Sequence, residues 1–102
     1  MLFRSPLLQA ARTGDVPVIN ALLAAGAAVD RAHPDGETPL MAASRAGSLE
    51  AVRLLLARGA NPNAQESFQQ QTALMWATAE GHADVVDALL AAGANEIGRA
   101  HV

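Results

Sequence analysis

The chain has 102 residues, of which 51% are hydrophobic but only 3% aromatic, and its formal net charge at pH 7 is −3. Most apolar residues are Ala or Leu, which favour helices, and the few β-branched residues argue against a sandwich or barrel. The absence of cysteine excludes disulfides and cysteine zinc sites, no apolar run is long enough to span a membrane, and the negative charge argues against a nucleic-acid binder.

The first predicted elements are two helices, at residues 6–13 and 16–24. Asp15 is placed to cap the second helix, and Pro17 falls within its first turn, where a missing N–H costs nothing. Gly26 follows the helix and can adopt the left-handed conformation that ends helices. The apolar stripe of the second helix is formed by Ile19, Leu22 and Leu23.

A second pair of helices is predicted at residues 39–46 and 49–57. It is preceded by Asp35-Gly36, the strongest short hairpin signal in the chain. Thr38 is a suitable N-cap, and a proline in the first turn follows it.

The third pair is predicted at residues 73–80 and 83–91. The loop before it, residues 66–71, is one residue longer than its counterpart in the second unit and has Gln70 where that counterpart has its turn glycine. Asp84 lies near the start of the last helix, where a negative charge suits the helix dipole.

These pairs belong to an internal repeat of 33 or 34 residues. The spacing is carried by two series of glycines, at positions 14, 47 and 81 and at positions 26, 59 and 93. Each unit buries its apolar stripe only by stacking on its neighbours. We therefore expect the most buried residues to be Leu22, Leu23, Leu40, Val52, Leu55, Leu56 and Leu74.

The repeat resembles the ankyrin family. Residues 38–43 (Thr-Pro-Leu-Met-Ala-Ala) match its T-P-L-H-x-A signature, residues 72–77 form a second copy, and residues 5–10 form a diverged one. The pattern of the tetratricopeptide repeat is absent. The resemblance implies an all-α solenoid of three helix-turn-helix repeats joined by hairpin-like loops. We expect a single ankyrin-repeat domain over residues 1–95, with repeats at about 1–32, 33–66 and 67–95.

The resemblance also implies a partner-binding surface on the hairpin tips and on the concave face of the first helices. Phe68 is the sharpest candidate, because interface hot spots favour rigid aromatics, although its ring could instead fold back onto its hairpin or onto Met75. Trp76 belongs either to the core or to an aromatic patch on the concave face. The candidate residues are Arg12, Thr13, His33, Asp35, Glu37, Arg45, Phe68, Gln69, Gln71, Trp76 and Glu80.

The sequence offers no basis for catalysis. It lacks a phosphate-binding glycine loop, a nucleophile elbow and an H-E-x-x-H motif. His82 follows Gly81 and is interpreted as a capping or packing residue. We therefore expect a monomeric, non-catalytic module that binds another protein and has no cofactor, metal, nucleic-acid or membrane partner. The alternative is a regulatory or targeting array fused to an enzyme, which a longer reading frame would reveal.

Residues 96–102 have a separate interpretation. Their sequence, Glu-Ile-Gly-Arg-Ala-His-Val, matches the in-frame translation of a common sequencing adapter, which continues with a stop codon. We interpret them as a non-native tail. The array is then expected to continue past Asn95 in a longer, bacterial protein.

Overall fold

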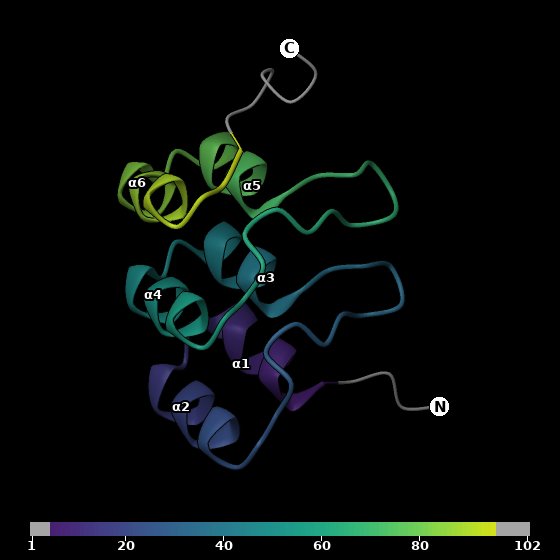
Figure 1. Ribbon diagram of the computed structural model, residues 1–102, viewed down its shortest axis with the longest axis vertical. Coiled ribbons are helices and arrows are strands. Elements are labelled where there is room, and N and C mark those ends of the chain that lie inside the picture. The colour runs from purple at the N-terminus through teal and green to yellow at the C-terminus, as the bar shows by residue number, and fades with distance from the viewer. Residues whose placement is uncertain (1–4, 96–102) are drawn as a thin grey trace.

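The structure is a computed structural model that describes residues 5–95. Within this range it contains six helices and no strand (Figure 1). The all-α architecture and all six predicted helices are confirmed, and one boundary differs, because α5 ends at Ala79 rather than at residue 80. The helices are α1 (Pro6–Thr13), α2 (Val16–Ala24), α3 (Pro39–Ala46), α4 (Leu49–Ala57), α5 (Ala73–Ala79) and α6 (Ala83–Ala91).

The first helix of each pair begins at a hydroxyl cap. The side-chain oxygens of Ser5, Thr38 and Thr72 each accept the backbone N–H three residues later, at 3.2–3.3 Å. This satisfies a donor that the helix itself leaves free. At Thr38 the cap is reciprocal, because the sulfur of Met41 accepts the backbone N–H of Thr38 at 3.5 Å.

The helices form two stacked rows (Figure 1). One row consists of α1, α3 and α5 and the other of α2, α4 and α6, with helices in contact along each row and within each pair. The hairpin loops extend on the side away from the second row. The core lies between the rows and is made largely of alanine and leucine, which lets the first helices pack closely.

The burial prediction is correct for five leucines and valines and wrong for two. The five are fully or almost fully buried, but Leu22 and Leu56 are only half-buried. Leu22 lines a hollow of the first repeat together with Ser5 and Arg31. Leu56 lines a groove between α4 and α6 on the outer surface. The five correctly predicted residues are Leu23, Leu40, Val52, Leu55 and Leu74.

Side chains of one repeat bind the backbone of the next. The carboxylate of Asp30 accepts the backbone N–H of Asn61 at 3.2 Å from each oxygen. Asn63 repeats this contact one unit later, accepting the backbone N–H of Asn95 at 2.7 Å. The same kind of contact therefore joins the first repeat to the second and the second to the third.

The proposed domain limits, and the interpretation of residues 96–102 as a non-native tail, stay predictions, since the tail lies outside the described residues. Among the described helices, none has both the length and the apolar character needed to cross a membrane.

Candidate functional site

Two hairpins lie side by side at the edge of the helix stack. The 33–37 hairpin is closed by the bond from the backbone N–H of His33 to the carbonyl of Glu37, at 2.9 Å. The 66–71 hairpin is joined to it where the backbone N–H of Ser67 donates to the carbonyl of Asp35, at 2.7 Å. Gly36 is required here, because its φ is +91° and an added Cβ would lie 2.8 Å from the backbone nitrogen of Ser67.

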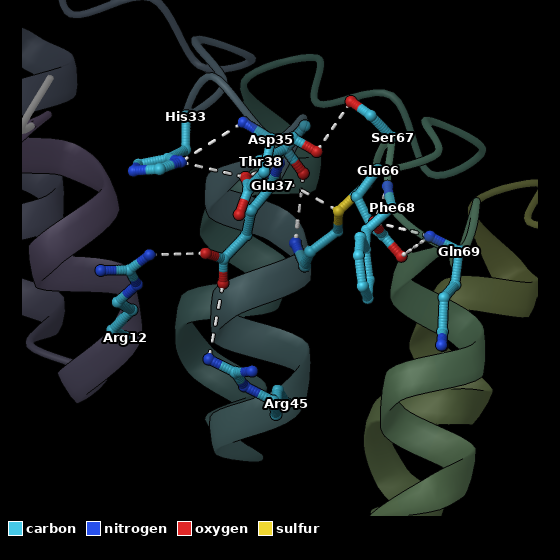
Figure 2. Close-up of polar contacts among 11 residues, drawn as sticks. Arg12, His33, Asp35, Glu37, Thr38, Arg45, Glu66, Ser67, Phe68 and Gln69 are labelled. Carbon is cyan, nitrogen blue, oxygen red and sulfur yellow. Dashed lines mark hydrogen bonds and ion pairs between the residues drawn. The ribbon is translucent and has the colours of Figure 1, made fainter.

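The 66–71 hairpin contains the only non-glycine residue with positive φ in the described chain, Gln70 at 58°. The carboxylate of Glu66, which is 8% exposed, holds this turn together. It accepts the backbone N–H groups of Phe68 at 2.6 Å and of Gln69 at 3.1 Å (Figure 2). It also accepts the backbone N–H of Gln71 at 3.1 Å. A side chain thus stabilises a turn that lacks the usual glycine.

These contacts favour the ionised form of the Glu66 side chain. Burial acts to raise the pKa of its carboxyl group, but the three backbone donors outweigh burial and lower the pKa below its ordinary value of 4.5. Sequence reasoning did not single out Glu66. The available signal was the longer loop without a turn glycine, which needs another group to satisfy its backbone.

Glu37 connects the hairpin to two helices. Its Oε1 lies 2.6 Å from the guanidinium of Arg12 on α1, and its Oε2 lies 3.6 Å from that of Arg45 on α3 (Figure 2). The side chain of Glu37 is only 14% exposed, so the pairing is partly shielded from water. Arg12 and Arg45 therefore lie on one face of the stack, and a hairpin carboxylate joins them.

Trp76 lies on the concave side of α5. Its ring is half-buried, and the guanidinium of Arg45 lies 5.0 Å from the ring centre, within the range of a cation–π contact. The equivalent positions in the earlier repeats are the smaller Gln9 and Ala42. The side chain packs against the core and also lines the concave side, so both interpretations hold in part, and its role in binding stays a prediction.

These groups surround one depression, here called the concave hollow, with a volume of about 430 Å³. Phe68 stands at its margin with 84% of its surface exposed, so its ring is not folded back onto the hairpin or onto Met75. The hollow is lined by Asp35, Glu37, Arg45, Glu66, Phe68, Gln69, Gln71, Trp76 and Ala79. Seven of the predicted site residues therefore lie together.

The remaining candidates lie around the hollow rather than in it. Arg12 contacts it only through Glu37. The hydroxyl of Thr13 is bonded to carbonyls of its own helix, the nearer at 3.1 Å. His33 lies beside Asp35, with Nδ1 and Oδ1 separated by 3.1 Å, and Glu80 is an exposed residue that follows α5.

His82, interpreted from sequence as a capping or packing residue, performs both roles for the neighbouring repeat. Its ring packs against Gly47, and its Nε2 lies 3.1 Å from the carbonyl oxygen of Arg45. Since a carbonyl only accepts, Nε2 carries the hydrogen. The residue makes no side-chain cap on its own helix. Within residues 5–95, no group of three or more acidic or histidine side chains is arranged to hold a metal ion.

The stacked helical hairpins define a helical-repeat solenoid. A family model for ankyrin repeats, in three copies, matches residues 7–99, and the chain belongs to this family. A search of curated proteins finds no match. Ankyrin repeats are generally protein–protein interaction modules and are typically non-catalytic.

Proposed function

We propose that this chain binds a partner protein through the concave hollow and the adjoining hairpin tips, without catalysing a reaction. The observation that carries the proposal is Phe68. A large apolar ring with 84% exposure is costly to leave in water, yet the loop that presents it is held by three backbone bonds to Glu66.

A preformed aromatic contact suits binding, because little conformational entropy is lost when a rigid loop meets its partner. Phe68 and Trp76 line the same hollow, together with the polar residues Gln69 and Gln71. Aromatic residues beside polar ones are a usual composition of interface hot spots. The solenoid supplies the frame that keeps the two aromatic residues close.

The test compares two truncations of exposed apolar side chains. Phe68→Ala removes the proposed contact, and Leu90→Ala removes a side chain that is 36% exposed on α6, outside the hollow. Proteins retained by the immobilised full chain from its native lysate are quantified by mass spectrometry, and folding is checked by circular dichroism. We expect Phe68→Ala to lose a partner that the wild type and Leu90→Ala both retain.

Equal retention by all three chains, with all of them folded, would refute the proposed surface. Selective loss with Leu90→Ala would place the interface on the outer helices instead.

A further inference from the structure

The concave hollow has a charge imbalance. Its lining contains three carboxylates, on Asp35, Glu37 and Glu66, and one guanidinium, on Arg45, which leaves a net charge of −2. Arg12 pairs with Glu37 from outside and brings the local charge to −1. The hollow is therefore negative even when its neighbouring cation is counted.

The two arginines are already paired with the same carboxylate. Glu37 places one oxygen against Arg12 and the other toward Arg45, and its side chain is mostly covered. An acidic partner group would have to displace Glu37 from this position. The positive charge near the hollow is thus satisfied within the protein.

The negative charge is accessible at Asp35. Its side chain is 54% exposed, and its contacts are the imidazole of His33 and the backbone N–H of Glu37, at 2.9 Å from Oδ1. The bond from the backbone N–H of Glu37 is the main cause that lowers the pKa of Asp35. The carboxyl group is therefore ionised at neutral pH, and a partner can approach it from solvent.

The aromatic residues add a preference for one kind of cation. Within the hollow, the guanidinium of Arg45 already lies over the ring of Trp76. The ring of Phe68 is open to solvent on the same border. A guanidinium stacks on aromatic faces. It is also more weakly hydrated than an ammonium group, so it loses less hydration free energy when it leaves water.

We propose that the concave hollow binds an arginine side chain carried by an exposed basic segment of the partner protein, stacked on Phe68 and paired with Asp35. This inference rests on the proposed function and specifies the chemistry of the partner. Charge complementarity and the open aromatic ring select arginine over acidic and purely apolar side chains.

Trp76 provides a direct readout, because it is the only tryptophan in the chain and lines the hollow. The full chain is titrated with hexa-arginine, hexalysine and hexaglutamate while tryptophan fluorescence is followed at two salt concentrations. We expect saturable binding of hexa-arginine that weakens with salt, weaker binding of hexalysine, and no binding of hexaglutamate.

Two variants and one matched control localise the binding. Asp35→Asn keeps the acceptor for the backbone of Glu37 but removes the charge, and Phe68→Ala removes the ring. Each should weaken hexa-arginine binding by about two- to fivefold, the scale of one exposed cation–π or ion-pair contact. Asp87→Asn makes the same charge change on exposed α6, away from the hollow, and should leave the affinity unchanged.

The inference is overturned if hexaglutamate binds as well as hexa-arginine, if hexa-arginine does not bind, or if Asp87→Asn weakens binding as much as Asp35→Asn. Any of these results would still be compatible with the proposed function if Phe68→Ala loses the partner that the wild type retains from the lysate. Loss of that dependence together with intact arginine binding would contradict the proposed function instead.

Discussion

The imidazole of His82 lies directly against Gly47, so that a Cβ built on the glycine would come within 2.6 Å of the ring. Gly47 has a φ of +78° and ends α3 in the left-handed conformation. The same histidine lies 3.1 Å from the carbonyl of Arg45, one of the carbonyls that α3 leaves free at its end. The third repeat thereby completes a helix of the second.

This contact separates two costs of replacing a glycine. Gly81 has almost the same φ, +77°, but a Cβ there would meet nothing within 4 Å. Gly81→Ala should therefore lower the free energy of unfolding by about 1–2 kcal/mol, the cost of a left-handed conformation. Gly47→Ala should lower it by this amount and by about 1 kcal/mol more, because of the clash with His82. Urea unfolding of both variants measures the difference. Equal losses of unfolding free energy would show that the His82 ring moves aside at no cost.

Ser44 presents the opposite case, a residue whose removal should help. Its side chain is fully buried and its hydroxyl oxygen has no hydrogen-bond partner, while the equivalent residue of the first repeat is Ala11. Ser44→Ala should raise the free energy of unfolding by about 1 kcal/mol. Thr78→Ala is the control, because that hydroxyl is bonded at 2.8 Å and the residue is exposed. A clear loss of stability in Ser44→Ala would mean that the hydroxyl is satisfied in solution.

Adjacent leucines of α4 should respond unequally to truncation. Leu55 is fully buried, so Leu55→Ala should cost about 2–5 kcal/mol from lost transfer energy and the cavity. Leu56 is half-buried on the outer groove, and Leu56→Ala should cost about 1–2 kcal/mol. Thermal unfolding followed by circular dichroism compares them. Similar melting temperatures for the two variants would contradict the described packing of α4.

Acid should loosen the 66–71 hairpin. The folded-state pKa of Glu66 is lowered from 4.5, so the folded state binds its proton less readily than the unfolded state does. The stabilisation is complete above pH 4.5 and is lost as the pH falls through the lower folded-state pKa. Stability measured from pH 7 to pH 3 should fall in this range, and Glu66→Gln should reduce the slope. If Glu66→Gln has the same slope of stability against pH as the wild type, the acid sensitivity arises from other groups.

The helices and the local caps could be predicted because each depends on residues close in sequence. Thr38 and Gly47 mark the start and the end of α3, and the repeat supplies the same signals elsewhere. Phe68 and Trp76 could be proposed from residue type and position alone. The side-chain pairing that shapes the hollow could not, because Arg12 and Glu37 are 25 residues apart and meet only after two repeats stack.

The error at Leu22 and Leu56 has a related cause. A helical stripe identifies the apolar side of a second helix, but it does not distinguish side chains that enter the core from those that lie over an outer groove. Neighbouring repeats decide this, since Leu23 is covered while Leu22 is only half-buried. Glu66 was missed because its role depends on the fold of a loop with an unusual turn.

The pairing of Glu37 also bears on the bending of the stack. Arg12 and Arg45 belong to successive first helices, and each points toward one oxygen of the same carboxylate. Any deformation that draws the two helix ends together brings like charges closer, and the carboxylate between them offsets that repulsion. The carboxylate of Glu37 therefore favours close approach of the C-terminal ends of α1 and α3, and so favours bending of the stack toward that side.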